Sequence, residues 1–509
     1  MTLVTPPSAH AQAGVGYVDV VRSAAFFADG SVRDGFDEFL SIVNTSDQVG
    51  DIVVRFTARN DTADNVLVPS LRLTLEGHEQ VTQSLRDHLS DQRVRLPVTF
   101  SLRIYSERPI AAELIRYFRT SYAGGVSGST TVVGAPEPEL VHLFADGGVG
   151  PERQDLLTIY YPILDDKRTK EKDASIDIFF GVERRGEVKH HMVVKQGDRT
   201  TIDVNRLLAD NGVHDSARVS TRLVSSEGVV VQRSSYMRSP IEGGTAILGT
   251  DIATPRWFFA TTMPDADQES IVVFNPGGGA SKVTATFRGA SVSALSGDVP
   301  PRGQVALEVP RGGGPASVDV VATGNVVVER TVGTPTNLST VRAARFLAHQ
   351  QTIPHGRAGE GVDHRISIGT AEGRRGQARL RFDARGEGDT VVAVPDLVVD
   401  VTGDAPTVVD VNAWMARNNV SQPVTVATEI KATEPIVAER YLRAAGPSGP
   451  AALVTGAFAL EEPEPVGLAR LFVGVALMAA MVVAAVVALL RALRPRSEES
   501  VAPPTAEAA

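Results

Sequence analysis

Residues 143–147 read Leu-Phe-Ala-Asp-Gly and repeat the motif Phe-Phe-Ala-Asp-Gly of residues 26–30. Shorter versions follow as Phe-Phe-Ala at 258–260 and Phe-Leu-Ala at 346–348. The alanines of the four motifs, at positions 28, 145, 260 and 348, are separated by 117, 115 and 88 residues. A motif that returns at such spacing is typical of a chain built from structural repeats.

A second motif is an apolar segment that ends each unit on Glu or Gln. These residues are Glu113, Gln232, Glu329 and Glu439, separated by 119, 97 and 110 residues. Two motifs that recur four times in the same order predict four units of roughly 100 residues. The four side chains alternate with apolar ones, so we expect them to point outward or to cap a neighbouring loop, and not to be catalytic.

Short segments with apolar residues at every second position fill each unit, as in residues 283–287, and turn signals such as Asn-Pro-Gly at 275–277 separate them. We expect Asn205 and Asn412 to cap single helical turns, and each unit to close with a hairpin, which in the first turns near Pro109. The pattern predicts an all-β fold of tandem immunoglobulin-like β-sandwich repeats followed by a single C-terminal transmembrane helix.

The transmembrane prediction rests on twenty residues without a charge, from Leu471 to Leu490. Such a helix would span about 30 Å, the thickness of the bilayer's hydrocarbon core. Arg491, Arg494 and Arg496 follow at once, and positive residues stay on the cytoplasmic side. We therefore expect a single-pass protein of the cell membrane, with the repeats extracytoplasmic and the C-terminal tail cytoplasmic.

That orientation needs an export signal. Ala11, Gln12 and Ala13 have the small-x-small form of a signal-peptidase site, without the basic and apolar regions that should precede it. We interpret the N-terminal segment as the remnant of a longer export signal, against the alternative of a tail-anchored protein with its bulk in the cytoplasm. The expected organisation is an N-terminal segment 1–22, repeat 23–122, linker 123–139, repeat 140–240, linker 241–254, repeats 255–338 and 339–458, juxtamembrane linker 459–470, transmembrane helix 471–490 and tail 491–509.

Composition excludes several functions. The 509 residues are 43% apolar and 22% charged, which supports ordered cores. The absence of cysteine excludes disulfides, cysteine-ligated metals and a thiol nucleophile, so each sandwich must be held by its apolar core alone. The net charge of -10 argues against a nucleic-acid partner.

The candidates for chemistry are few. His349, His355 and His364 lie near Glu360 and Asp363, but their spacing is not that of helical zinc ligands, and loop histidines are usually solvated. We expect the Asp-Gly pairs of the opening motifs to form turns. We therefore assign no catalytic residue, no cofactor and no metal site, and predict that the protein is not an enzyme.

The two motifs, the Asp-Val-Asn step at 203–205 and the linking stretches 121–139 and 242–255 resemble repeats of uncharacterised actinobacterial secreted or membrane-anchored proteins. The resemblance covers nearly all of residues 24–458 and weakens in the third and fourth units. It implies β-rich repeats at the cell envelope and carries no established activity.

We expect a non-enzymatic, membrane-anchored extracytoplasmic scaffold or adhesion protein, with four sandwiches projecting in a row and an envelope protein or a glycan as partner. The alternative is an accessory subunit of a membrane-bound machinery for cell-envelope glycan biosynthesis. Small residues in the predicted helix, such as Gly474 and Ala480, would then allow close packing against another helix.

Overall fold

The computed structural model describes residues 22–459, apart from residues 165–171, 264, 335–336, 421, 447–448 and 457. This part of the chain is almost entirely β-structure with three short α-helices, and the all-β prediction is confirmed. The predicted transmembrane segment, the cytoplasmic tail and the proposed signal remnant up to residue 21 lie outside the described residues. No helix among the described residues is long and apolar enough to cross a membrane.

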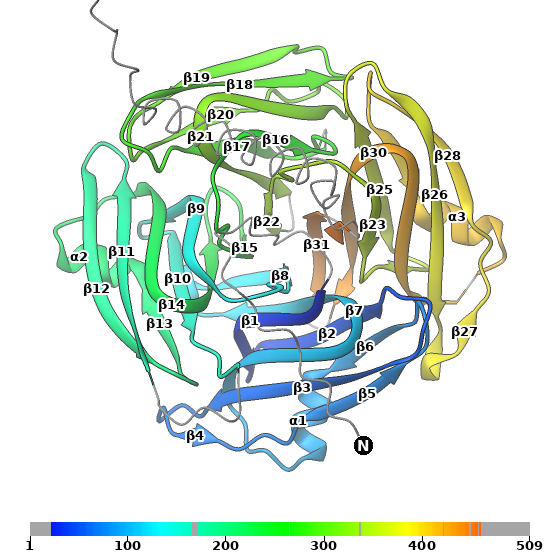
Figure 1. Cartoon of the computed structure of the whole chain (residues 1–509), viewed down its shortest axis with the longest axis horizontal. Coiled ribbons are helices and arrows are strands. Elements are labelled where there is room, and N and C mark those ends of the chain that lie inside the picture. Colours follow the sequence, from blue (N-terminus) through cyan, green and yellow to red (C-terminus); the bar gives the residue numbers. More distant parts are fainter. Residues whose placement is uncertain are drawn as a thin grey trace, which may run out of the picture. The chain divides into compact units, whose positions relative to one another are not determined.

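The strands fall into four consecutive sets, each with its own sheet (Figure 1). The first contains β1 (Arg22–Val32), β2 (Phe36–Asn44), β3 (Gly50–Arg59), β4 (Asn65–Val66), β5 (Leu71–Leu75), β6 (Gln80–Ser84), α1 (Leu85–Asp91), β7 (Val98–Thr120) and β8 (Val126–Val133). The second contains β9 (Glu139–Val149), β10 (Arg153–Tyr160), β11 (Asp173–Val182), β12 (Gly186–Lys195), β13 (Arg199–Asp203), α2 (Val204–Asp210), β14 (Ala217–Met237) and β15 (Gly243–Leu248).

The other two sets repeat this order. The third contains β16 (Thr254–Phe259), β17 (Gln268–Phe274), β18 (Ser281–Arg288), β19 (Ala294–Val299), β20 (Gln304–Glu308), β21 (Ser317–Thr334) and β22 (Asn337–Arg342). The fourth contains β23 (Ala348–Ile353), β24 (Arg357–Ala358), β25 (Asp363–Thr370), β26 (Arg375–Arg385), β27 (Val391–Val392), β28 (Leu397–Thr402), β29 (Thr407–Asp410), α3 (Val411–Arg417), β30 (Val424–Gly446), β31 (Gly449–Gly456) and β32 (Phe458–Ala459).

Each repeat is organised by one long strand that belongs to two sheet layers. In the second repeat, the first half of β14 pairs with β9 and β11, and the second half pairs with β10 and β15. The strands β7, β21 and β30 do the same in the other repeats. All these pairings are antiparallel, and the two layers of each repeat enclose an apolar core, as expected of a β-sandwich.

The predicted closing hairpin is wrong, because the two segments are one continuous strand. In β7 the first half pairs with β3 up to Ser106, and the second half pairs with β2 from Ile110. Pro109 lies between these two halves, where no ladder partner requires an N–H group. The turn signal therefore marks the point where the strand passes from one layer to the other.

Four separate apolar cores hold the repeats, as expected for a chain without disulfides. Their centres include Phe27 in the first repeat, Phe180 in the second, Trp257 in the third and Ile366 in the fourth, all fully buried. The first core continues into the second repeat through residues such as Tyr160. The repeats are thus packed against one another and are not beads on a flexible string.

The predicted helical turns are present, but their caps differ. The helices α2 and α3 begin after Asp203 and Asp410, whose side chains accept the capping hydrogen bonds. Asn205 instead donates to the carbonyl oxygens of Gly150 and Arg153, and so fixes the loop before β10. The cap is therefore an aspartate two positions before the expected asparagine in both helices.

The four repeats close into a ring, so the expected row is wrong for this part of the chain (Figure 1). The strands β8, β15, β22 and β31 follow the long strand of each repeat and lie beside one another around the centre, with β31 next to β8. Two of them lie in the stretches 123–139 and 241–254, which we had expected to be linkers. Ring closure brings the fourth repeat against the first, a contact that no local sequence pattern encodes.

Candidate functional site at the junctions between repeats

The Asp-Gly pairs of the opening motifs lie inside strands, so the prediction that they form turns is wrong. In β1, Ala28 and Asp29 lie opposite the single residue Ser101 of β7. In β9, residues 145–146 lie opposite the single residue Ser220 of β14 in the same way. Two residues against one is a β-bulge, which redirects a side chain from its usual face. The bulge turns each aspartate toward the next repeat.

The closing Glu and Gln residues meet these bulges from the neighbouring repeat. Their equivalence is confirmed by the register, since Glu113, Gln232, Glu329 and Glu439 face equivalent positions of the adjacent strand. Glu329 accepts hydrogen bonds from the backbone N–H groups of Ala145 and Asp146, at 3.0 and 2.9 Å. The expectation that these side chains cap a neighbouring loop was therefore close, although what they cap is the bulge of another repeat.

A buried arginine completes three of the four junctions. Arg233 donates to Glu329 at 2.8 Å, and Arg330 donates to Glu439. At the closure of the ring, Arg440 forms two hydrogen bonds with Glu113, at 2.7 and 3.0 Å. A bidentate pair is directional, so Arg440 and Glu113 fix the orientation of the fourth repeat on the first.

The junction of the first and second repeats uses different partners. Gln232 exchanges hydrogen bonds with the backbone of Asp29. The Asp29 carboxylate accepts from Arg199 at 2.9 Å and from Arg116 at 3.1 Å. Burial alone would raise the pKa of Asp29, but the two guanidinium groups outweigh it and lower this pKa. The neighbouring Glu38 has its pKa raised to about 7, chiefly by burial.

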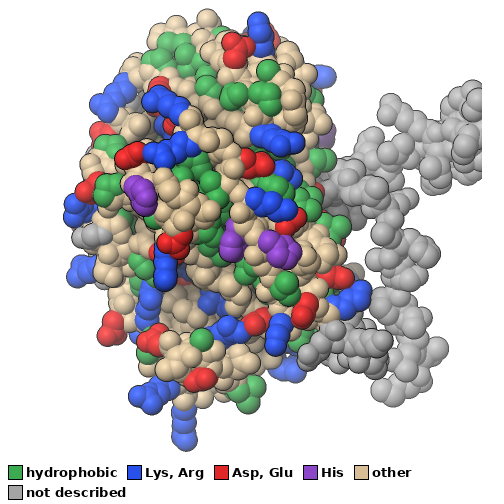
Figure 2. All heavy atoms as spheres, turned by 90° about the vertical axis from the view of Figure 1, so that its left-hand side faces the viewer, with side chains coloured by type: hydrophobic (Ala, Val, Ile, Leu, Met, Phe, Trp, Pro, Cys, Tyr) green, Lys and Arg blue, Asp and Glu red, His purple; other side chains and the backbone are tan. Residues whose placement is uncertain are grey.

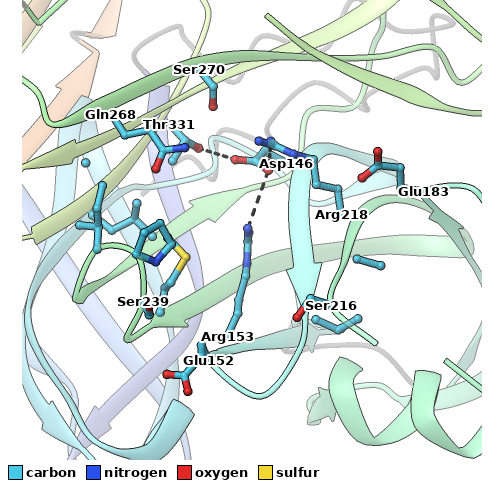
Figure 3. Close-up of a pocket in the computed structure, with 17 residues that line it drawn as sticks. Asp146, Glu152, Arg153, Glu183, Ser216, Arg218, Ser239, Gln268, Ser270 and Thr331 are labelled. Carbon is cyan, nitrogen blue, oxygen red and sulfur yellow. Dashed lines mark hydrogen bonds and ion pairs between the residues drawn. The ribbon is translucent and has the colours of Figure 1, made fainter. Parts of the chain in front are cut away.

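The junction of the second and third repeats contains a hollow of about 330 Å³ (Figure 3). Asp146 lies on its wall, with Arg153 and Arg218 at 4.0 and 3.6 Å from its carboxylate, and Thr331 of the third repeat donates to it. Burial raises the pKa of Asp146 less than Arg153 and Arg218 lower it, so the group stays charged. Thr331 thus binds Asp146 across the junction, while Arg153 and Arg218 approach the same carboxylate from within the second repeat.

The fourth repeat departs from this pattern. In the first, second and fourth repeats, one residue before the bulge forms a β-bridge to the segment that follows the long strand: Phe26, Leu143 and Thr352. The bulge residue comes three positions after this residue in each repeat. The residue equivalent to Asp29 and Asp146 is therefore His355, and the opening motif of this repeat is not residues 346–348. The short Phe-Leu-Ala match was misleading because it lies before the equivalent strand positions.

A second acidic position is also a histidine in this repeat. The side chains of Glu38 and Asp155 accept hydrogen bonds from the backbone N–H groups of Ser31 and Gly148. Each of these acidic residues lies opposite the residue of the long strand that comes three positions after the closing Glu or Gln. In the fourth repeat the residue in this position is His364, which lies opposite Leu442. His355 and His364 thus replace a pair of carboxylates.

Both histidines are buried, so the expectation that they are solvated is wrong. His355 is 4% exposed and His364 is 0% exposed, and both ring nitrogens of His355 lack a hydrogen-bond partner among the described residues. Burial and the positive charge of Arg440 hold the pKa of His355 well below its usual range and lower that of His364 to about 3. Both rings are therefore neutral at pH 7.

A larger hollow opens beside His355, between the first and fourth repeats. We call it the seam cleft. Its volume is about 790 Å³, within the range of small-molecule sites. The first repeat lines it with strands β2, β6 and β7, and the fourth with β24, β26 and the segment before β24. The lining residues are Phe39, Val81, Thr82, Gln83, Ser84, Asp87, Ile115, Tyr117, His355, Arg357, Arg385, Gly386, Asp389 and Thr425.

The structure does not gather the histidines noted in the sequence into a metal site. His349 contacts the Ala432 carbonyl oxygen, while Asp363 pairs with Arg365. Within the described ranges, no three His, Asp or Glu side chains are placed to hold a metal ion. Sequence reasoning missed the seam cleft, because its only signal was the substitution of His for Asp within a repeat whose register was not yet known.

The surface of the second repeat is mixed in character. Figure 2 shows Lys and Arg side chains interspersed with Asp and Glu over this face, with small groups of hydrophobic side chains between them. Its adjacent histidines point to different sides, as expected for a strand, since His190 is half-buried and His191 is exposed and contacts Asp177 at 2.9 Å. Nothing on this face forms a large patch of one sign.

No protein-family model and no curated protein matches the sequence. Among solved structures, Thermotoga maritima 1070 is similar over 22% of this chain and 93% of its own, at 18% identity and a TM-score of 0.18. A bacterial ice-binding adhesin involved in host cell surface retention matches over 64% of this chain and 99% of its own, at 11% identity and a TM-score of 0.11. A tetra-tandem repeat of a large adhesion protein covers 85% and 94%, at 9% identity and a TM-score of 0.09. At these TM-scores none of the three is informative about this chain.

Proposed function

We propose that this protein is a non-enzymatic binding scaffold of the cell envelope, in which a rigid ring of four immunoglobulin-like sandwiches is held outside the membrane by a C-terminal helix. The observation that carries the proposal is the set of buried junction contacts. Arg440 with Glu113, and Arg233 with Glu329, join repeats that are adjacent in the ring. Charged groups used in this way fix one geometry, and a fixed geometry presents the clefts between repeats as preformed sites.

The anchoring part of the proposal comes from the sequence. The uncharged segment from Leu471 to Leu490 is long enough to span a bilayer, and the arginines after it favour a cytoplasmic tail. A partner of the ring would then be met outside the cell, as an envelope protein or a glycan.

The absence of cysteine allows a direct test of the topology. In Leu67→Cys the new thiol lies on an exposed loop, since Leu67 is 92% exposed, and in Ser497→Cys it lies in the tail. A membrane-impermeant maleimide applied to intact cells should label Leu67→Cys and should label Ser497→Cys only after lysis. Labelling of Leu67→Cys only after lysis would overturn the proposal and favour a tail-anchored protein with a cytoplasmic ring.

A further inference from the structure

The seam cleft continues into a second hollow and so has the form of a groove. The second hollow has a volume of about 400 Å³ and shares Arg357, Arg385, Gly386 and Thr425 with the first. A continuous hollow of this kind accommodates an extended ligand better than a compact one. The equivalent hollow between the second and third repeats is less than half the size of the seam cleft.

One wall of the groove is aromatic and apolar. Phe39 and Tyr117 lie edge to face, with ring centroids 5.9 Å apart, and Ile115 packs in the same cluster. In the hollow of the second and third repeats, the positions equivalent to Phe39 and Tyr117 are Ser270 and Gly333. The seam thus has an apolar face that its counterpart lacks, suited to the C–H face of a ring-shaped ligand.

The groove carries no excess of positive charge. Its lining contains two arginines, Arg357 and Arg385, and three acidic residues, Asp87, Asp389 and Glu387. Arg385 is also held by Glu79 at 3.1 Å and by Asp383 at 3.2 Å. Donors and acceptors are therefore both present without an excess of positive charge, which favours a neutral polar ligand over an anion.

His355 adds a specific requirement. A neutral imidazole offers one N–H donor and one acceptor nitrogen, and both nitrogens of His355 lack a partner among the described residues. A hydroxyl group both donates and accepts, so it satisfies such a ring. A cation is disfavoured by Arg440, which donates to the carbonyl oxygen of His355.

From these features we infer that the seam cleft binds a neutral glycan, with a sugar ring against Phe39 and Tyr117 and a hydroxyl group on His355. The site deepens the proposed function, since it assigns the chemistry of the partner that the scaffold would hold. The binding itself depends only on the folded ring and not on the membrane topology.

The test uses the full-length chain, purified in detergent, on an array of neutral oligosaccharides (mannan, galactan, arabinan and glucan fragments) together with uronic and phosphorylated sugars. Calorimetry with the best-bound fragment then measures the affinity of two variants. Phe39→Leu keeps apolar volume but loses the aromatic face and should bind roughly three- to tenfold more weakly. His355→Leu should bind roughly tenfold more weakly or worse, because a ligand hydroxyl is left unpaired.

Two comparisons separate binding from folding. His355→Leu replaces an unpartnered buried polar group by an apolar one, so the variant should unfold at the same or a higher temperature than the parent. Ser270→Ala changes the position equivalent to Phe39 in the other hollow and should leave glycan affinity unchanged. The inference is overturned if no neutral oligosaccharide on the array binds, if only uronic or phosphorylated sugars bind, or if Phe39→Leu and His355→Leu bind as the parent does. A failed topology test with intact glycan binding would overturn the proposed function alone.

Discussion

The hollow between the second and third repeats and the seam cleft are formed by equivalent strands but differ in chemistry. In the first, Asp146 is bound across the junction by Thr331 and neutralised by Arg153 and Arg218. In the second, the same backbone position carries His355, which is neutral and without a partner in the described part of the chain. The aspartate at this position binds the neighbouring repeat at one junction, whereas the His355 ring at the equivalent position of the other junction binds no described residue.

The difference shows that equivalent junctions can differ in chemistry although the repeats share one fold. A ring of repeats can lose the polar contact at one bulge position, provided that other contacts hold the two repeats of that junction together. At the seam these contacts are the bidentate pair of Arg440 and Glu113 and the pairs Arg385–Glu79 and His78–Glu429.

The largest effect is expected for Arg440→Met. Glu113 is 1% exposed and would keep only the Thr131 hydroxyl as a donor among the contacts seen here. Leaving a buried carboxylate without its counter-ion should lower the free energy of unfolding by about 3–5 kcal/mol. Urea denaturation measures this change.

The matched variant is Arg233→Met at the junction of the second and third repeats. Glu329 keeps the backbone N–H groups of Ala145 and Asp146, so the loss should be smaller than in Arg440→Met. Equal losses in the two variants would show that the seam does not depend on its arginine more than the other junction does.

A smaller loss is expected for Asp146→Asn, which removes the charge that holds Arg153 and Arg218 together. The charged carboxylate also strengthens the hydrogen bond from Thr331, since hydrogen bonds to a charged group contribute about 1.5–3 kcal/mol, and the two partly exposed arginines add a screened attraction, so we expect a loss of about 2 kcal/mol. Differential scanning calorimetry against the parent measures it. His355→Leu, at the equivalent position, is the control and should show no loss; a loss of the same size there would remove the contrast between the two junctions.

The pH dependence of stability should reveal the buried histidines. The pKa of His364 is lowered from 6.5 to about 3. Between these two pH values the unfolded chain therefore binds a proton at His364, whereas the folded chain does not. Its contribution to stability is complete above pH 6.5 and is lost as the pH falls toward 3. At pH 5 the loss from this residue is about 2 kcal/mol.

Urea unfolding at pH 7.5 and pH 5 measures this loss, and His364→Leu should reduce it by the same amount. The variant keeps all carboxylates, so the difference between the two proteins isolates the imidazole. If the parent and His364→Leu lose the same stability between these pH values, His364 is accessible to protons in the folded ring.

The smallest effect concerns the wall of the seam cleft. The Ser84 side chain caps α1 by accepting from the N–H group of Asp87, and both residues line the cleft. Ser84→Ala should cost about 1 kcal/mol in denaturant unfolding. Asp203→Ala removes the equivalent cap of α2, away from any seam, and should cost a similar amount. A much larger cost for Ser84→Ala would mean that the cleft wall depends on its cap for its shape.

The sequence alone determined the elements whose cause is local. Alternation of apolar residues specified the strands, because side chains of a strand point to alternate faces. The recurrence of Glu113, Gln232, Glu329 and Glu439 specified four equivalent long strands, since each residue holds the same place in the register. The helical turns after Asp203 and Asp410 were also visible, although the capping residue was assigned two positions too late in both.

Tertiary structure decided everything that depends on which segments meet. Whether Pro109 marks a hairpin or a crossing between layers depends on the partners of each half of β7, which lie far away in the chain. The bulge at Asp29, the closure of the fourth repeat on the first and the burial of His355 follow from the same cause. The role of a charged group or of an imidazole side chain depends on neighbours that are hundreds of residues away in the sequence. Only the closed ring of four repeats brings those neighbours together.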